Sequence, residues 1–147
     1  MKSFVFIGHV DTGKSTLCGN LLYQCKHVSD HEMNKIREEA SKIKMEKWVW
    51  AHVLDFNEEE KIRGKTHEHN IIDFKFEDQK YQLIDTPGHQ TFIRAMIEGI
   101  YQQADIGVLL VSMMENEFIS SFERGMLKEH LMLVRSLGLK HLIIAAN

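Results

Sequence analysis

Near its start the chain reads Gly8-His9-Val10-Asp11-Thr12-Gly13-Lys14-Ser15. This stretch fits the pattern Gly-x-x-x-x-Gly-Lys-Ser, whose glycines let the backbone turn tightly and bring its N–H groups close to phosphate oxygens. The lysine supplies a positive charge for the phosphates, and the serine supplies a hydroxyl for Mg²⁺. A helix that follows such a loop points its positive end at the anion. The stretch therefore predicts a nucleotide-binding loop, although by itself it does not distinguish GTP from ATP.

Apolar runs and helical patterns alternate along the rest of the chain. Short apolar runs suited to buried strands, and a hairpin around Asp78-Gln79, predict strands at residues 3–7, 71–77, 80–85, 105–111 and 141–146. Apolar residues at steps of three and four, among other signals, predict helices at residues 14–26, 31–47, 91–103 and 122–137. This alternation predicts an α/β domain with three layers, α/β/α, and a mainly parallel sheet.

Composition excludes several classes of function. The 147 residues carry 18 basic and 21 acidic side chains, a net charge of −3, which argues against binding DNA through bulk electrostatics. No apolar run approaches the roughly 18 residues of a membrane span, so we expect no membrane partner. Cys18 and Cys25 are separated by about 10 Å on the expected helix, too far for a disulfide. Two free thiols are typical of a reducing compartment, so we expect a cytoplasmic protein.

A second motif, Asp85-Thr86-Pro87-Gly88-His89, follows an expected strand. Asp85 at that strand end can hold the water shell of Mg²⁺. Gly88 can donate its N–H to a γ-phosphate, and Pro87 fixes one backbone angle beside it. His89 then falls where a side chain can orient an attacking water. Taken alone, the motif is equally an ordinary strand-to-helix turn.

A third stretch, Arg63-Gly64-Lys65-Thr66, precedes the expected hairpin. Its threonine can reach both Mg²⁺ and the γ-phosphate from a loop that orders in the triphosphate state. An isolated Gly-Lys-Thr is more often just a turn. Two histidine pairs, His67 with His69 and His27 with His31, can each share a face, but neither has a third metal ligand at fitting spacing. Exposed polar histidines are the simpler interpretation.

Together these motifs resemble the G domain of translational GTPases, the group of elongation factor Tu, its eukaryotic and archaeal counterparts, and the eukaryotic release-factor GTPase. Further matching stretches are Val53-Leu54-Asp55, Phe92, Met96-Ile97, Gly99, Gln103-Ala104-Asp105, Glu129-His130 and Leu142-Ile143-Ile144. In this family, an asparagine at the position of Asn147 opens the guanine-reading motif Asn-Lys-x-Asp. The resemblance covers essentially the whole chain, in order and with matching spacing.

The resemblance implies a P-loop NTPase fold, truncated after the fifth strand. Residues 1–147 would be a partial GTP-binding domain, without the downstream β-barrel domains of the family. His89 would be catalytic, and Mg²⁺ would be bound by Ser15, Thr66 and, through water, Asp85. Residues that contact the nucleotide would be Val10, Asp11, Thr12, Gly13, Lys14, Ser15, Thr16, Pro87, Gly88 and Asn147.

The implied function is a switch that binds GTP or GDP with Mg²⁺, hydrolyses GTP with water, and acts on the ribosome. A tRNA or a class I release factor would bind through the domains absent here. Lys65, where elongation factors usually carry an apolar residue, and Leu54-Asp55-Phe56-Asn57-Glu58-Glu59 favour the release-factor branch. Two alternatives stay open: a truncated nucleotide-binding or interaction module without productive turnover, and the GTPase subunit of sulfate activation. The Gly-Lys-Thr-x-Glu pattern disfavours the second of these.

Overall fold

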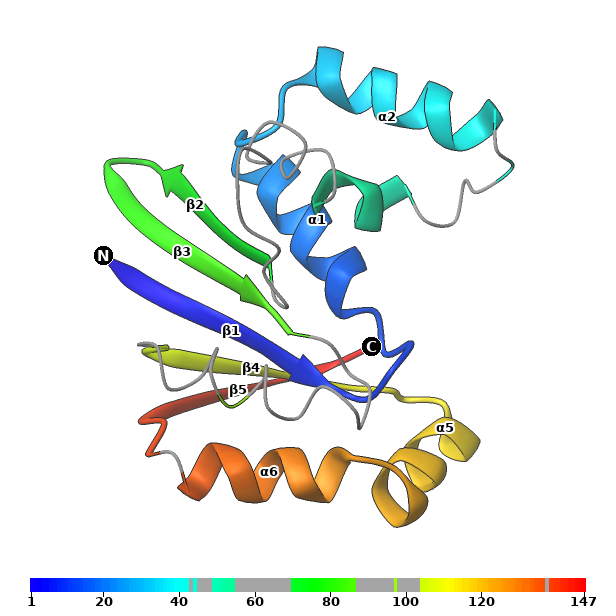
Figure 1. Ribbon diagram of the computed structural model, residues 1–147, viewed down its shortest axis with the longest axis vertical. Helices are drawn as coiled ribbons and strands as arrows, with labels where there is room; N and C mark the ends of the chain where they lie inside the picture. Colours follow the sequence, from blue (N-terminus) through cyan, green and yellow to red (C-terminus); the bar gives the residue numbers. More distant parts are fainter. Residues whose placement is uncertain (43, 45–48, 55–69, 87–96, 98–103, 137) are drawn as a thin grey trace.

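The computed structural model describes residues 1–42, 44, 49–54, 70–86, 97, 104–136 and 138–147. Within them, one sheet has the strand order β2-β3-β1-β4-β5 (Figure 1). Its strands are β1 Lys2–Gly8, β2 Asn70–Phe76, β3 Gln79–Asp85, β4 Ile106–Val111 and β5 His141–Ala146. Only the β2–β3 pair is antiparallel among these strands, so the predicted mainly parallel sheet and its hairpin are confirmed.

Two helices follow β1 closely, and their ends correct the sequence prediction. Helix α1, Lys14–Gln24, stops two residues early, and Lys26 beyond it has a positive φ of 56°. Helix α2, Asp30–Lys42, begins after Ser29, whose hydroxyl accepts the N–H of Glu32 at 3.3 Å while the Glu32 carboxylate accepts the N–H of Ser29 at 2.8 Å. This reciprocal cap fixes the start of the helix. An unpredicted helical segment covers residues 49–54.

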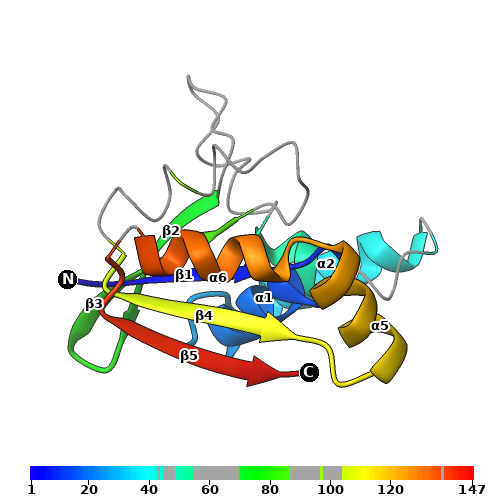
Figure 2. The same ribbon diagram turned by 90° about the horizontal axis from the view of Figure 1, so that it is seen from below.

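The alternation of side chains along the strands gives the sheet two apolar faces. Phe6 and Leu83 belong to one core, which α1, α2 and the helical segment 49–54 cover. Val5, Ile7 and Ile84 belong to the other, which helix α6, Leu127–Ser136, covers. Figure 1 and Figure 2 show α1 and α6 on opposite sides of the strands. The predicted three-layer arrangement is therefore confirmed.

The predicted helix at 122–137 is wrong at its start. A short helix α5, Glu115–Ile119, and a π-helical turn, Ser120–Arg124, come first, and the chain is extended at Gly125. A Cβ atom at Gly125 would lie 2.8 Å from backbone atoms of Ser121 and 3.0 Å from Cε1 of His9. The helix is interrupted where the chain approaches the loop after β1, a long-range contact that helical periodicity does not report. The predicted helix at 91–103 lies almost wholly outside the described residues.

Strand β5 has the predicted bounds but little cover. Its central side chains Leu142, Ile143 and Ile144 are 40%, 49% and 66% exposed. Within the part of the chain that the structure describes, its pairing partner is β4 alone. In that same part of the chain, every helix is too short or too polar to cross a lipid bilayer.

Candidate phosphate-binding site

The loop between β1 and α1 has glycines where its backbone requires them. Gly13 caps α1 with a left-handed φ of 90°, which a side chain rarely tolerates. At Gly8, a Cβ atom would lie 2.7 Å from the carbonyl oxygen of Leu110, so the loop passes directly against β4. Because the carboxyl ends of parallel strands meet at one edge, the loop lies at the edge where ligands bind in such sheets.

Lys14 is folded into this loop and is only 7% exposed. Its Nζ donates to the carbonyl oxygens of Gly8 at 2.9 Å and His9 at 2.7 Å. The hydroxyl of Thr12 also donates to the His9 carbonyl, at 2.8 Å. Burial lowers the pKa of Lys14, and the negative charge of Asp85 opposes that shift. The loop therefore holds a nearly buried cation at its centre, as recognition of an anion requires.

The end of β3 meets the start of α1 through Asp85. The hydroxyl of Ser15 donates to Oδ2 of Asp85 at 2.8 Å, and the carboxylate residue is 9% exposed. The next residue, Thr86, donates its hydroxyl to the Phe6 carbonyl at 2.6 Å, which ties this strand end to β1. Mg²⁺ prefers oxygen ligands and is commonly bound by one or two carboxylates. The adjacent hydroxyl and carboxylate therefore fit a Mg²⁺ site.

Cys18 completes the contact between α1 and Asp85. Its Sγ lies 3.9 Å from Oδ1 of Asp85, and the side chain is fully buried. Burial and the Asp85 charge raise the pKa of Cys18 well above its ordinary value, so the thiol stays protonated at neutral pH. Both Cys18 and Cys25 are free thiols, as the sequence predicted. The contact with Asp85 was not predicted, because it joins positions 67 apart in sequence.

Helix α6 places a buried histidine close enough to the loop to interact with Lys14 and His9. His130 is 1% exposed, and burial, followed by electrostatic interaction with Lys14 and then with His9, lowers its pKa to about 4. Among the described residues, no hydrogen-bond partner reaches Nδ1 of His130 or Nδ1 of His9. His130 is thus neutral at pH 7. His130 was identified from the sequence only as part of a family match, although its spacing from Leu127 and Val134 marks the buried face of α6.

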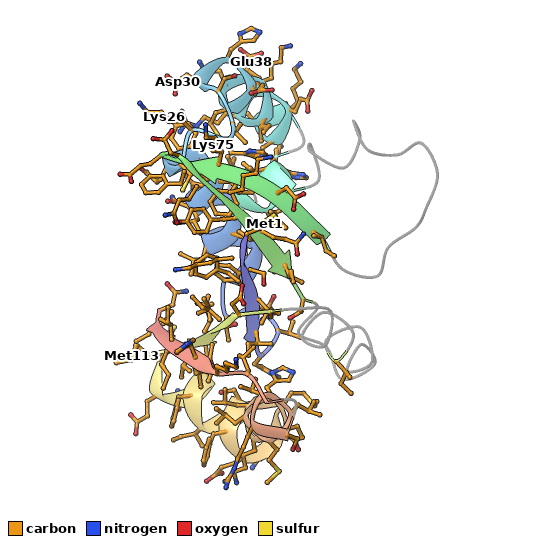
Figure 3. All side chains as sticks on the ribbon, turned by 90° about the vertical axis from the view of Figure 1, so that its left-hand side faces the viewer. Met1, Lys26, Asp30, Glu38, Lys75 and Met113 are labelled. Atoms are coloured by element: carbon orange, nitrogen blue, oxygen red, sulfur yellow. The ribbon has the colours of Figure 1, made fainter. Side chains whose placement is uncertain are left out.

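Asn147 reaches the loop from the end of β5. Its side-chain Nδ2 donates to the Thr12 carbonyl at 3.0 Å. Its backbone N–H donates to Val111 at 2.9 Å, and its carbonyl accepts from Met113, labelled in Figure 3, at 2.7 Å. Two strand ends, β4 and β5, are therefore locked together beside the phosphate-binding loop.

The structure thus brings part of the predicted site to one edge of the sheet. Ser15 contacts Asp85, and Asn147 contacts Thr12. The same loop and first helical turn carry the predicted nucleotide residues Val10, Asp11, Thr12, Gly13, Lys14, Ser15 and Thr16. The predicted residues Thr66, Pro87, Gly88 and His89 lie outside the described residues.

The two histidine pairs have different outcomes. His67 and His69 lie outside the described residues. His27 precedes α2, which begins at Asp30, so the expectation that His27 and His31 share one face of a helix is wrong. Among the described residues, no three His, Cys, Asp or Glu side chains are grouped to hold a metal ion.

Comparisons with known proteins agree with this geometry. The family described as "Elongation factor Tu GTP binding domain" matches residues 1–147. The chain is similar to the eukaryotic peptide chain release factor GTP-binding subunit of Schizosaccharomyces pombe, with 43% identity over 146 residues, 99% of this chain and 22% of that protein. The subunit of the same name from Dictyostelium discoideum is 38% identical over 145 residues, again 99% of this chain and 26% of that protein. The chain therefore spans about a quarter of these relatives or less.

Solved structures extend the likeness to three dimensions. A crystal structure of Sup35 complexed with GDP has a TM-score of 0.56 and 34% identity, covering 97% of this chain and 25% of that one. The GTPase-like domain of Saccharomyces cerevisiae Ski7, bound to GDP and inorganic phosphate, has a TM-score of 0.67 over 82% of this chain and 27% of that one. At 22% identity, Ski7 supports the fold alone. The predicted P-loop fold is confirmed.

Proposed function

The chain belongs to the family of elongation factor Tu GTP-binding domains, and we propose that it is the nucleotide-binding part of a GTP-hydrolysing switch in protein synthesis. The observation that carries the proposal is the contact set around the loop: Lys14 nearly buried on its carbonyls, and Ser15 bonded to Asp85 at 2.8 Å. The release-factor names of the relatives favour termination over elongation. Those relatives give no support to the sulfate-activation or non-hydrolysing alternatives.

Each residue of the loop has a part in binding GTP. The backbone N–H groups of Val10 to Thr16 and the Lys14 ammonium bind the phosphate oxygens. Ser15 and Thr66 would hold Mg²⁺ through their hydroxyl groups, and Asp85 would act through a bound water. When bound, Mg²⁺ neutralises charge on the β and γ phosphates. Asn147 borders the guanine base, next to the Thr12 carbonyl that it already contacts.

Hydrolysis uses a water molecule as the nucleophile. His89 orients that water for in-line attack on the γ-phosphorus, while Pro87 and Gly88 bring a backbone N–H to the γ-phosphate. The bond from phosphorus to the bridging oxygen breaks, giving GDP and inorganic phosphate, and the water loses its proton to solvent or phosphate. Amides of the loop and Lys14 stabilise the charge that develops on the transferred group.

Partners follow from the family rather than from these 147 residues. We propose that residues 1–147 are a partial GTP-binding domain of a longer protein, whose β-barrel domains bind tRNA or a class I release factor. The ribosome accelerates hydrolysis, as expected of a switch in protein synthesis whose partner helps to neutralise the charge of the transition state. Action on the ribosome implies a cytoplasmic location.

The test is phosphate release from GTP, measured with and without ribosomes. We compare the parent with His89→Ala and with His31→Ala, a control on the exposed face of α2. We expect ribosomes to accelerate the parent and His31→Ala equally, and His89→Ala to be slower by about 100-fold or more. Equal rates for His89→Ala and the parent would remove His89 from catalysis. If the parent released no phosphate in either condition, GTP hydrolysis would be contradicted. The alternative of a nucleotide-binding module without turnover would then be favoured.

A further inference from the structure

Helix α1 presents two side chains to the same carboxylate. The Ser15 hydroxyl donates to Oδ2 of Asp85 at 2.8 Å, and the Cys18 thiol contacts Oδ1 at 3.9 Å. Residues three apart on a helix share one face, so both contacts arise from one side of α1. The carboxylate is therefore held through both of its oxygens by a single rigid element.

Cys18 has a fixed place between the sheet and the helical segment 49–54. It is fully buried and belongs to the core that also contains Phe6, Leu22 and Val53. At the adjacent Gly19, a Cβ atom would lie 1.8 Å from the carbonyl oxygen of Trp50, which shows how closely this segment presses on α1. The Cys18 side chain is therefore enclosed in the core beside a tight contact between α1 and the segment 49–54.

We propose that Cys18 is a positioning residue for Mg²⁺: its S–H turns the Asp85 carboxylate so that the other oxygen faces the Ser15 hydroxyl. The inference rests on the proposed function, since it concerns the metal that accompanies the nucleotide. The terminal torsion of an aspartate is broad, so contacts at both carboxylate oxygens restrict its orientation more than a contact at one oxygen does. Mg²⁺ demands near-ideal geometry, and groups that orient its ligands commonly change metal affinity by about 10- to 100-fold.

A simple packing role makes a different prediction for substitutions of Cys18. Cys18→Ser keeps an O–H donor but puts a polar group in an apolar core. Cys18→Ala and Cys18→Val both remove the donor, and the valine keeps the volume filled. If the donor matters, serine behaves like the parent while alanine and valine do not. If packing matters, valine or alanine behaves at least as well as serine.

The experiment follows the dissociation of fluorescently labelled GDP at Mg²⁺ concentrations from zero, in EDTA, to the millimolar range. We expect the half-effective Mg²⁺ concentration to rise about tenfold in Cys18→Ala and Cys18→Val, and to change less than about twofold in Cys18→Ser. The rates in EDTA should agree across all variants, because the phosphate contacts of the loop remain. Cys25→Ala is the matched control, since Cys25 is the free thiol at the end of α1.

Two results would overturn the inference while leaving the proposed function intact. One is a Mg²⁺ dependence in Cys18→Ala and Cys18→Val that equals that of the parent. The other is a serine variant as impaired as the alanine variant, which would assign Cys18 to packing. A parent dissociation rate that does not respond to Mg²⁺ would overturn the proposed metal site itself, and the inference with it.

Discussion

The two ends of the nucleotide site are built differently. At the phosphate end, Lys14 is 7% exposed and bonded to two carbonyls, and Ser15 is bonded to Asp85. At the base end, Asn147 is exposed and meets the loop through one side-chain hydrogen bond, at the end of a strand whose Ile144 is 66% exposed. Among the described residues, the phosphate end is buried and interlocked, whereas the other end is exposed and is joined to the loop by one side-chain hydrogen bond.

This difference shows which part of a nucleotide site can be formed by residues that are close together in the sequence. Eight consecutive residues and one strand end form the phosphate site, because its donors are mostly backbone groups and the first turn of α1. The proposed base contact, Asn147, follows β5 and meets the loop only through a long-range hydrogen bond to the Thr12 carbonyl. We therefore expect substitutions at the phosphate end to have larger effects than those at the base end.

The largest effect should come from Lys14. Lys14→Met keeps much of the buried stem but removes the ammonium, whose charge-assisted bonds to phosphate contribute on the order of 3 kcal/mol. We expect GDP affinity, measured by calorimetry, to fall by about 100-fold or more. Lys42→Ala, at the exposed end of α2, should bind as the parent does. A loss of GDP affinity below about fivefold for Lys14→Met would contradict the larger contribution that we expect from the phosphate end.

A second effect concerns the pH dependence of stability that arises from His130, the buried histidine of α6 near the phosphate loop. His130 has a pKa of about 4 in the folded protein, against 6.5 for an ordinary histidine. The unfolded chain therefore binds a proton at higher pH than the folded protein does. The stability that neutral His130 contributes is present above pH 6.5 and is lost as pH falls toward 4.

Urea unfolding at several pH values measures this contribution. Between pH 6.5 and 4 the parent should lose more unfolding free energy than His130→Gln, by on the order of 3 kcal/mol. His31→Gln, which changes an exposed histidine, should follow the parent. Parallel pH profiles for the parent and His130→Gln would contradict a neutral His130.

The smallest effect belongs to the base end. Asn147→Ala removes the hydrogen bond to the Thr12 carbonyl, which in this exposed position contributes about 1 kcal/mol. We expect GDP affinity to fall about fivefold. Asn147→Asp should bind more weakly still, because it places a negative oxygen against a carbonyl. An aspartate variant equal to the parent would show that this contact does not shape the site.

Local sequence patterns predicted the strands, the hairpin and the phosphate loop, because buried strands and tight glycine turns have local signals. They missed the break before α6, which depends on the approach of Gly125 to His9. They also missed the thiol of Cys18 beside Asp85, because that contact forms only when β3 lies next to α1. The phosphate loop and Asp85 were predictable because each lies in a recognisable motif, whereas the contact of Cys18 with Asp85 lies in no motif and arises only from packing.

The most direct test of this account is a competition experiment against fluorescently labelled GDP in the presence of Mg²⁺. The competitors are inorganic diphosphate, which occupies only the phosphate end, and guanosine, which occupies only the base end. We expect diphosphate to displace the labelled GDP at concentrations far below those at which guanosine does. Displacement by guanosine at equal or lower concentrations would contradict it.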